Sequence, residues 1–459
     1  MSLPDGRLVA YYGDDFTGSA AVMEVLTFAG LPTVLFLDTP NAEQVARFAG
    51  YRGVGIAGVA RARGPAWMEE NLPLAFDALA RLSASIAHYK VCSTFDSAPH
   101  VGSIGKAIDL AAPLLGGDWH PLLVAAPPIH RYQLFGNLFA TVDGVGYRLD
   151  RHPTVSRHPT TPMDEADVRV HLARQTARTI GLVDYLALTS GAGDAALART
   201  RHDGAEIVAI DVLDEESLAE AGRLIWENRG ERLLVIGSQG VEYALIAHWR
   251  AAGLIGDPPP PREAGETRIA AVSGSCSPAT GRQIDWAEAN GLAAIRLDVA
   301  AAVDEGRWHV VLDGAIEAAK RALAGGLSPL VYTARGPDDV AIPALKRAIL
   351  ATGESEEEVN ARIGTGLGAI LRAVVTSTDI RRVAIAGGDT SGHALAGLGI
   401  MALEAEVALA PACAINIARS DDADIDGLEV ALKGGQMGPV DYFGMIERGR
   451  PQQDGVRGR

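Results

Sequence analysis

The chain has 459 residues, of which 48% are hydrophobic, 21% are charged and only 5% are aromatic. At about 150 residues per domain this length predicts two or three domains, or two large ones, and the composition excludes a disordered chain and a collagen. The 57 Asp and Glu residues outnumber the 41 Lys and Arg residues, so the net charge of -16 would repel nucleic acids and anionic lipid surfaces. We therefore expect a globular protein without a nucleic-acid or membrane partner.

The three cysteines, Cys92, Cys276 and Cys413, lie far apart and show no spacing typical of a metal site. They indicate small buried residues in a reducing compartment, without a disulfide framework or a zinc site. The first residues lack the pattern of a signal peptide, and the most apolar long stretch, 394–418, is interrupted by two glutamates and a proline. We therefore expect a cytoplasmic protein.

In the first half of the chain, short apolar runs that predict buried strands alternate with stretches of helical spacing. The apolar runs are 8–12, 33–37, 53–59, 88–93, 121–126, 205–211 and 232–237, and the helical stretches are 20–29, 67–87, 103–115 and 217–228. This alternation predicts a parallel sheet that is covered by helices on both faces.

Residues 256–266 contain four consecutive prolines, which can continue neither a helix nor a central strand and so predict an extended linker. A second alternation follows, with segments at 268–272, 294–297, 310–326, 329–333, 363–378, 382–386 and 429–433 and with helices from Pro278, near 341–352 and after 386. We predict an α/β protein of two domains, 1–255 and 267–459, joined by the linker 256–266. Each domain would be a mainly parallel sheet flanked by helices, with a ligand cleft between the two, because open α/β sheets bind ligands beyond the carboxyl ends of their strands.

Two adjacent carboxylates, Asp14 and Asp15, follow the first predicted strand and precede a helix, with glycines on either side. Carboxylates at a strand end can orient substrate hydroxyls, and one of them can act as a general base. The alternative is that Asp15 or Thr17 only caps the helix.

Polar residues also follow the apolar run 88–93. Ser93, Thr94 and Asp96 supply hydroxyls and a carboxylate that suit a polyol or a sugar acid, although an ordinary loop rich in Asp, Ser and Pro is the alternative. Further along, residues 148–163 hold three arginines, Arg148 and Arg151 among them, and an arginine cluster in an acidic protein is a candidate anion site. The alternative there is surface ion pairing with the acids at 164–167.

Three loops rich in glycine and hydroxyl groups follow strands of the second half, at 272–280, 386–392 and 432–438. The backbone N–H groups of such loops, at helix N-termini, can form a cradle for phosphates. Asp389 could hold Mg²⁺ directly or through water, and Lys433 could neutralise a phosphate. The loops contain neither a Walker A sequence nor a GxGxxG fingerprint, but together they favour a nucleotide site over tight turns.

In this order, the motifs resemble those of the four-carbon acid sugar kinase family over nearly the whole chain. Five elements carry the resemblance: Asp-Asp-x-Thr-Gly at 14–18, His-Pro-x-Thr-Pro-Met at 158–163, Ser-Gly-Ser at 273–275, the glycine loop at 387–392 and Leu-Lys-x-Gly-x-x-Gly at 432–438. The resemblance implies an N-terminal domain that binds a sugar acid and a C-terminal domain that binds ATP with Mg²⁺.

The motifs and the resemblance together assign residues to two sites, with Asp15 as the residue that accepts the hydroxyl proton and Asp14 as the second choice. The sugar acid would be held by Asp14, Asp15, Thr17, Ser93, Thr94, Asp96, Arg148, Arg151 and His158. ATP would be held by Ser273, Ser275, Gly387, Gly388, Asp389, Thr390, Ser391, Lys433, Gly434 and Gly435. No set of metal ligands is assigned.

The sugar side departs from the family's pattern. Members usually carry Asp-Ser-Thr-x-Arg-Gly where this chain has Cys-Ser-Thr-Phe-Asp-Ser at 92–97, and a later Gly-Arg-Thr element is replaced at 135–139. Because those arginines would recognise the substrate carboxylate, its partner stays open among Arg131, Arg148, Arg151 and Arg157.

We therefore predict an ATP-dependent kinase that phosphorylates a hydroxyl of a four- to six-carbon sugar acid or keto sugar acid in carbohydrate catabolism. The alternative is a non-catalytic sensor that binds a sugar acid and a nucleotide, while a nicotinamide-dependent dehydrogenase lacks its dinucleotide fingerprint. The identity of the sugar acid, the hydroxyl and the oligomeric state stay open, although an Ala-rich, weakly charged surface helix could pair two subunits into a homo-oligomer.

Overall fold

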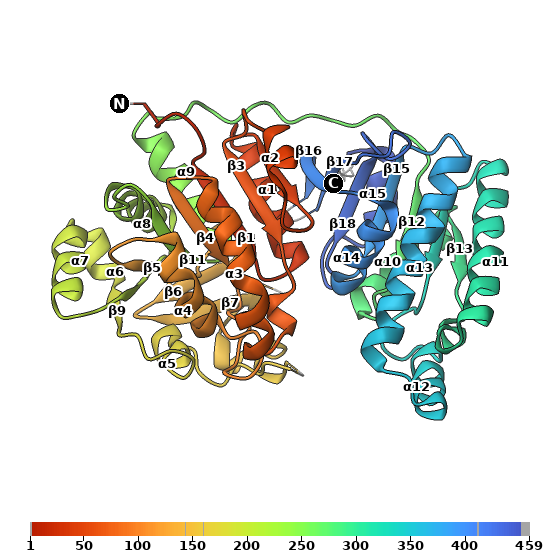
Figure 1. The fold of residues 1–459 in the computed structure, drawn as a ribbon, viewed down its shortest axis with the longest axis horizontal. Helices are drawn as coiled ribbons and strands as arrows, with labels where there is room; N and C mark the ends of the chain where they lie inside the picture. The colour runs from red at the N-terminus through yellow and green to blue at the C-terminus, as the bar shows by residue number, and fades with distance from the viewer. Residues whose placement is uncertain (1, 143, 159, 411–412, 451–459) are drawn as a thin grey trace, which may run out of the picture. The chain divides into compact units, whose positions relative to one another are not determined.

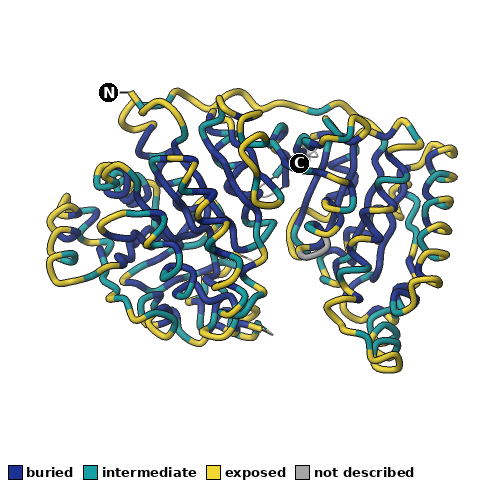
Figure 2. The backbone as a smooth tube through the Cα atoms, in the orientation of Figure 1, coloured by how far each residue is buried: buried dark blue, intermediate teal, exposed yellow. Residues whose placement is uncertain are grey.

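A computed structural model describes residues 2–142, 144–158, 160–410 and 413–450, without the side chains of Asp389 and Thr390. The chain divides into two compact units, Met1–Pro259 and Pro260–Arg459 (Figure 1). In the tube of Figure 2 the interior of each unit is buried, and the exposed residues lie mostly on the helices and loops at its surface.

The first unit is built on a parallel sheet in the order β2-β3-β1-β4-β11-β5-β10-β9. These strands are β1 (Val9–Gly13), β2 (Thr33–Phe36), β3 (Gly53–Ala57), β4 (Ile86–Lys90), β5 (His120–Leu123), β9 (Ile180–Val183), β10 (Ile207–Ile210) and β11 (Leu233–Gly237). Every residue of β1 to β5, β10 and β11 is buried, as a parallel sheet with both faces covered requires. The parallel sheet predicted for the first half is confirmed.

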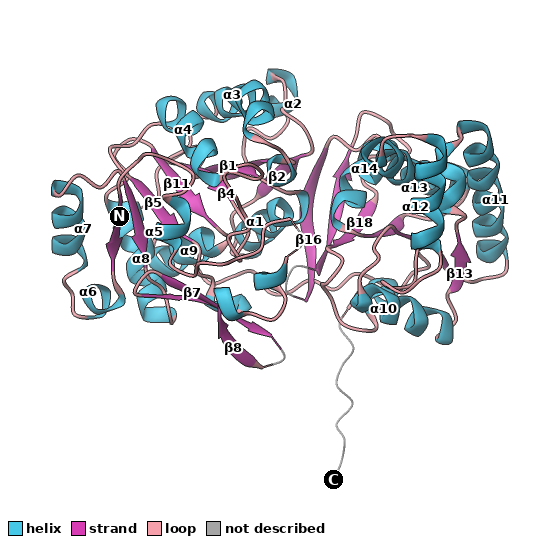
Figure 3. Cartoon of the chain, turned by 90° about the horizontal axis from the view of Figure 1, so that it is seen from below, coloured by secondary structure: helices cyan, strands magenta, loops and turns pink. Residues whose placement is uncertain are grey.

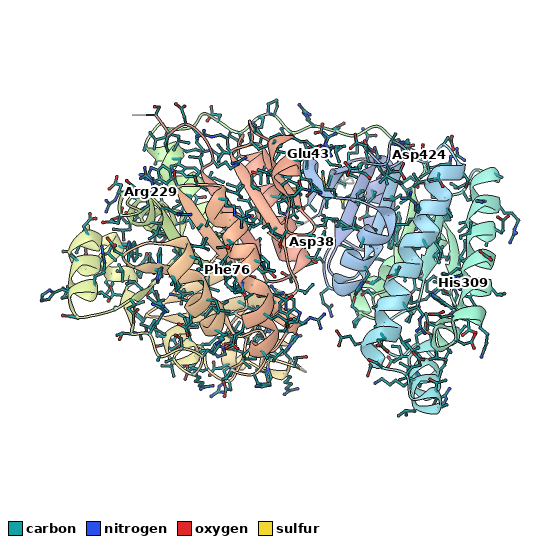
Figure 4. The ribbon with its side chains drawn as sticks, in the orientation of Figure 1. Asp38, Glu43, Phe76, Arg229, His309 and Asp424 are labelled. Atoms are coloured by element: carbon teal, nitrogen blue, oxygen red, sulfur yellow. The ribbon has the colours of Figure 1, made fainter. Side chains whose placement is uncertain are left out.

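Helices cover both faces of this sheet. The helical elements are α1 (Phe16–Phe28), α2 (Ala42–Ala46), η1 (Ala60–Ala62), α3 (Pro65–Arg81), α4 (Ile104–Leu115), η2 (Pro127–Ile129), η3 (Leu149–Arg151), η4 (Val155–Arg157), α5 (Val168–Leu172), α6 (Tyr185–Thr189), α7 (Gly193–His202), α8 (Glu215–Glu227) and α9 (Gly240–Ala251). Figure 3 shows α3 and α4 on one face and α1, α8 and α9 on the other. Apolar side chains join the layers, and Phe76 of α3, labelled in Figure 4, meets the rings of Tyr12 and Tyr89 at 5.9 and 6.0 Å between centroids.

A small antiparallel sheet, which the sequence analysis did not predict, projects from the first unit. It consists of β6 (Arg131–Leu134), β7 (Asn137–Val142) and β8 (Val145–Arg148). The buried carboxylate of Asp211 holds the turn between β6 and β7, because it accepts hydrogen bonds from the backbone N–H groups of Phe135 and Gly136 at 2.5 and 3.0 Å. Both turn residues have positive φ, so this contact stabilises a conformation that the sequence pattern does not reveal.

The second unit has its strands in the order β13-β14-β12-β15-β18-β17-β16. They are β12 (Ala270–Ser273), β13 (Ala293–Arg296), β14 (Pro329–Tyr332), β15 (Arg382–Ala386), β16 (Ala402–Ala410), β17 (Cys413–Arg419) and β18 (Glu429–Lys433). The first five in this order are parallel, whereas β17 pairs antiparallel with both β18 and β16. The sheet is therefore mainly parallel, as predicted, but the antiparallel pair β16 and β17 was missed because its Ala-rich sequence hides the alternation typical of strands.

The helical elements of the second unit are α10 (Pro278–Ala289), η5 (Val299–Val303), α11 (Glu305–Ala324), α12 (Ala341–Thr352), α13 (Glu356–Ser377), α14 (Gly388–Leu398) and α15 (Tyr442–Arg448). Helices α11, α13 and α14 lie on one face of the sheet and α10 on the other (Figure 3), and α15 packs against α10. A Cβ on Gly368 of α13 would lie 2.5 Å from the carbonyl oxygen of Ala394, so a glycine is required for α14 to pack this closely. This packing fixes the position of α14, which carries the loop predicted to bind phosphate.

Two local expectations are wrong. The helix predicted over 67–87 ends earlier, since α3 stops at Arg81 and Ser83 adopts a φ of 53° before β4 begins at Ile86. Cys276, expected to be buried, is exposed on the loop that precedes α10. None of the helices in the described residues combines the length and the apolar character that crossing a bilayer requires.

Candidate functional site

The carboxyl end of β1 places Asp14 and Asp15 at the start of α1. The N–H group of Asp14 donates to the carbonyl oxygen of Lys90 at 2.9 Å, which ties this end of β1 to the end of β4. Asp15 is the N-cap of α1, and its side chain accepts from the N–H group of Gly18 at 3.1 Å. The capping role of Asp15 is therefore present, and it sets the direction of the carboxylate.

Arg61 of η1, which follows β3, joins the two carboxylates. Its Nη2 lies 2.6 Å from Oδ1 of Asp14 and 2.7 Å from Oδ1 of Asp15, and its Nε donates to Oδ2 of Asp14 at 3.2 Å. The side chain of Asp14 is 1% exposed and that of Asp15 is 28% exposed. Burial raises the pKa of Asp14 against the opposing effect of Arg61, with a further increase from Asp15. Asp15 is thus the carboxylate of the pair that a ligand can reach.

The end of β4 adds a second cation, Lys90, and the polar segment that follows it. The side chain of Lys90 is buried, and its Nζ donates to the carbonyl oxygen of Val91 at 2.7 Å. Just beyond, the Sγ of Cys92 lies 2.9 Å from Oγ1 of Thr94, and burial raises the pKa of the thiol to about 11, so the side chain is neutral at pH 7. Ser93 and Asp96 are half-buried beside them.

The sequence analysis missed both Arg61 and Lys90. A parallel sheet brings the carboxyl ends of β3, β1 and β4 to one edge, although their residues are far apart in the chain. The available signal was position, because Arg61 stands just after the apolar run 53–59 and Lys90 lies within the run 88–93. This signal is weak, since many basic residues stand at strand ends for solubility alone.

The arginines predicted for the anion site are dispersed. Arg148 forms a two-pronged ion pair with Asp150, with both N···O distances at 2.7 Å, and Arg151 lies 3.7 Å from the same carboxylate with its side chain 74% exposed. Nδ1 of His158 accepts from the N–H group of Thr161 at 3.1 Å, which holds the local turn. The ion pairs of Arg148 and Arg151 agree better with the predicted alternative, pairing at the surface, than with an anion site. Their partner is Asp150, however, and not one of the acids at 164–167.

Arg131 on β6 is better placed than Arg148 and Arg151 to meet an anion near the polar segment. It is half-buried, its Nη1 donates to two backbone carbonyls, and its Nε has no partner in the described residues. Burial lowers the pKa of Arg131, while the nearby Cys92 and Asp96 act in the opposite direction. The structure therefore brings Arg131 into the electrostatic range of the segment 92–97.

In the second unit, the side chain of Lys433 connects two of the predicted loops, 272–280 and 432–438. Its Nζ, at the buried end of β18, donates to Oγ1 of Thr280 at 2.8 Å and to the carbonyl oxygens of Gly434 and Gly435 at 3.2 and 3.3 Å. Burial lowers its pKa to about 8. All three N–H groups of this ammonium are used by the protein, which the sequence analysis did not anticipate.

The loop 434–439 turns its carbonyl oxygens toward α10. Nε2 of Gln283 lies 3.1 Å from the carbonyl oxygens of Met437 and Gly438 and 2.9 Å from that of Pro439. Because a peptide unit is planar and trans, an inward carbonyl turns the N–H group of the next residue the other way. The N–H groups of Gly435 and Gln436 are therefore directed away from Lys433, as a phosphate-binding nest requires.

The neighbouring strand ends add further polar groups, one of which has no partner in the described residues. Ser273 at the end of β12 is buried, and its Oγ has no hydrogen-bond partner in the described residues. A Cβ on Gly435 would lie 2.7 Å from Oγ of Ser275, so a larger residue in this loop would require that side chain to move. Gly387, with a φ of 136°, leads into α14, whose first turn contains Gly388 and Ser391. These groups fit an anionic ligand such as a nucleotide phosphate.

A metal site is not preformed in the part of the chain that the structure describes, where no three His, Cys, Asp or Glu side chains come together as ligands. The predicted Mg²⁺ residue, Asp389, and its neighbour Thr390 have side chains outside the described residues. Since Mg²⁺ in kinases is held largely by phosphates and water, the absence of a described cluster is compatible with a metal that arrives with ATP.

Comparison with known proteins bears on both units. Family models for a sugar-binding N-terminal domain and a nucleotide-binding C-terminal domain match residues 9–245 and 270–443. The chain is 50% identical over 450 residues to a 3-oxo-isoapionate kinase from Paraburkholderia graminis, covering 97% of this chain and 95% of the relative. It is 30% identical over 443 residues to a 3-oxo-tetronate kinase from Burkholderia multivorans, covering 95% and 96%.

Solved structures agree on the fold. A protein from Salmonella typhimurium matches with a TM-score of 0.78 and 23% identity, covering 96% of this chain and 98% of its own. A protein from Haemophilus influenzae matches with a TM-score of 0.72 and 22% identity, covering 95% and 99%. At these identities the likeness concerns the fold, and it extends over nearly the whole of each chain.

Proposed function

The chain belongs to the four-carbon acid sugar kinase family and is a phosphotransferase that acts on sugar acids; from this premise we propose that its acceptor is 3-oxo-isoapionate or a closely similar oxo sugar acid. The observation that carries the proposal is the 50% identity, over nearly the whole chain, to a kinase named for that substrate. 3-Oxo-tetronate is the second candidate, since the relatives named for it are 30% identical or less. The comparisons give the non-catalytic sensor no support.

In the proposed reaction Asp15 accepts the proton of the reacting hydroxyl. ATP supplies the phosphoryl group: a bond forms between the hydroxyl oxygen and the γ-phosphorus, the bond from that phosphorus to the β-phosphate oxygen breaks, and ADP leaves with the electron pair. Asp15 suits the role of base because its carboxylate is partly exposed and is directed by both Arg61 and the N–H group of Gly18. Thr17, in the first turn of α1, and Ser93 and Thr94 would bind the other hydroxyls.

Asp14 acts in this scheme through Arg61 and not on the substrate. Its carboxylate is almost completely buried and forms two hydrogen bonds with the guanidinium. A guanidinium held on two points by Asp14 presents its remaining edge to Asp15 in one orientation. We therefore assign Asp14 as a positioning residue and Asp15 as the catalytic base.

Arg131 is the arginine that we assign to the substrate carboxylate. Its half-buried position beside Cys92 and Asp96 supports the assignment, as does the unused Nε. Arg148 and Arg151, the arginines predicted from the sequence, already pair with Asp150 at an exposed position. An exposed and already paired arginine contributes little to binding.

The phosphates of ATP would lie on the N–H groups of Gly435 and Gln436, beside Ser273, Ser275 and the first turn of α14. The inward carbonyls of the loop 434–439 and the unused Oγ of Ser273 support this assignment. Mg²⁺ would neutralise charge on the phosphates, with Asp389 as the candidate ligand. Transfer requires the acceptor and the phosphate to meet, and the predicted cleft between the units stays a prediction, as do the cytoplasmic location and the homo-oligomer.

The test combines a substrate panel with one substitution. Release of ADP is measured with ATP, Mg²⁺ and either 3-oxo-isoapionate, 3-oxo-tetronate or other sugar acids of four to six carbons. We expect the highest kcat/KM with 3-oxo-isoapionate, and turnover of none of them would overturn the proposal. Asp15→Asn keeps an N-cap residue, so it should preserve folding and ATP affinity while kcat falls about 100-fold or more. An equal loss of ATP affinity would mean that Asp15 supports the fold instead.

A further inference from the structure

Two lysines are buried at the ends of interior strands, Lys90 on β4 with 2% exposure and Lys433 on β18 with none. Burying an ammonium group is costly unless its N–H groups find acceptors. Lys433 finds three in its own protein, as described above. Lys90 finds one in the described residues, the carbonyl oxygen of Val91. Its other two N–H groups have no acceptor among the described residues, and such unused buried donors concentrate at functional sites.

The ammonium of Lys90 is directed at the same point as the carboxylate of Asp15. Lys90 pairs in register with Gly13 of β1 and Gly237 of β11, so no side chain stands beside it on either neighbouring strand. A Cβ on Gly18 would lie 2.6 Å from Nζ of Lys90 and 2.4 Å from Oδ1 of Asp15. Both charged groups therefore reach the first turn of α1, where the helix N-terminus adds its own positive potential.

The net charge of this cluster rises from zero to +1 when the reacting hydroxyl gives its proton to Asp15. Asp14, Asp15, Arg61 and Lys90 together carry two negative and two positive charges. Arg61 is paired with both carboxylates, whereas Lys90 forms no ion pair in the described residues. Once Asp15 has taken the hydroxyl proton, the cluster carries one net positive charge beside the reacting oxygen. A fixed positive charge at that point stabilises the phosphoryl group in transfer.

We propose that Lys90 is a catalytic residue whose ammonium donates hydrogen bonds to the phosphoryl group as it reaches the hydroxyl beside Asp15. This assignment rests on the proposed kinase function. Lys90 keeps its three protons throughout: the hydroxyl proton goes to Asp15, the new oxygen–phosphorus bond forms, and the electron pair of the broken bond leaves with ADP. Lys433 has the different task of holding the nucleotide loops.

The experiment compares Lys90→Met with Lys106→Met, which removes a surface lysine of the same unit that pairs with Glu69. Steady-state kinetics with ATP and 3-oxo-isoapionate give kcat and KM, and calorimetry gives the affinities of the sugar acid and of its phosphorylated product. For Lys90→Met we expect kcat to fall about 100-fold or more and product affinity to fall about tenfold or more, with sugar-acid affinity within about threefold of wild type. Lys90→Arg, which keeps the charge, should recover part of kcat, and Lys106→Met should match wild type.

Two results would overturn the role of Lys90. One is a kcat of Lys90→Met within about threefold of wild type. The other is an equal loss of sugar-acid and product affinity, which would mean that the lysine binds the substrate itself or only supports the fold. If Lys90→Met does not fold, the same affinities are measured for the uncharged Lys90→Gln, where selective weakening of product binding supports the proposal and unchanged affinities or equal losses refute it. A wild-type enzyme that turns over neither 3-oxo-isoapionate nor 3-oxo-tetronate would overturn the proposed function, and the role of Lys90 with it.

Discussion

Gly18→Ala tests the convergence of charges at the start of α1. The added methyl group would lie 2.4 Å from Oδ1 of Asp15 and 2.6 Å from Nζ of Lys90, both closer than side chains tolerate. Both obstacles are the ends of side chains, so the backbone can stay in place while the carboxylate and the ammonium move outward. The substitution is therefore expected to disturb the reacting groups more than the fold.

The magnitude follows from opposing effects. Replacing glycine by alanine inside a helix favours folding by about 1 kcal/mol. Displacing Asp15 weakens the cap on the N–H group of Gly18, which costs about 1 kcal/mol, so the free energy of unfolding should change by less than about 1 kcal/mol. A displacement of about 1 Å at reacting groups can lower the rate about 100-fold, and we expect a loss of that order in kcat.

The assay pairs thermal unfolding with steady-state ADP release, and Gly306→Ala serves as the control. Gly306 also lies in a first helical turn, in α11, but the atom nearest to the position of its added methyl group, Oδ1 of Asp304, is 3.5 Å away. The control should keep its kcat and gain slightly in stability. A Gly18→Ala protein with wild-type kcat, or one whose activity falls only as far as its stability does, would refute the reasoning.

Four further substitutions test the roles of Lys433 and Arg131 and the effect of one buried carboxyl group, that of Glu24 in α1. Lys433→Met should raise the KM for ATP about tenfold or more and leave the KM for the sugar acid unchanged in steady-state kinetics, because the loop 434–439 loses its anchor. Burial raises the pKa of Glu24 from 4.5 to about 8, so the free energy of unfolding of the wild type falls as the pH rises from 4.5 to 8. In denaturant titrations, Glu24→Gln should therefore be more stable than wild type by a few kcal/mol at pH 9 and similar to it at pH 4. Arg131→Ala should raise the KM for the sugar acid about tenfold or more, whereas Arg148→Ala should leave it near wild type, and the reverse order would favour the exposed segment.

Much of the fold was predictable because parallel strands are buried on both faces and so appear as continuous apolar runs. The runs at 8–12, 53–59 and 232–237 became β1, β3 and β11, and the helix near 341–352 is α12. The strands β6 to β8 were not predicted, because the turn between β6 and β7 depends on Asp211, which lies far from them in the chain. The strands β16 and β17 were not predicted, because alanine occurs in both helices and strands and its spacing therefore indicates neither.

The candidate site divides in a similar way. The order of the motifs, with two acids after the first strand and three glycine-rich loops in the second half, is a property of the chain itself, and its resemblance to the four-carbon acid sugar kinase family indicated a sugar-acid kinase. The sequence also contained the capping role of Asp15, because an N-cap involves residues three apart. It could not assign a partner to the substrate carboxylate, because four arginines were chemically equivalent until burial and pairing distinguished Arg131 from Arg148 and Arg151.

Local chemistry was therefore determined by the sequence alone: which segments are apolar, where helices start, and which loops offer free N–H groups. Only the tertiary structure decided which charges meet. Arg61 and Lys90 come to Asp15 from different strands because parallel pairing aligns the carboxyl ends of β3, β1 and β4 at one edge. Lys433 is turned inward because the end of β18 lies next to α10, where the ammonium donates hydrogen bonds to Thr280 of α10 and to two backbone oxygens. The two buried lysines, which look alike in the sequence, thus differ in their hydrogen bonds: Lys433 has three acceptors within the protein, whereas Lys90 has one in the described residues.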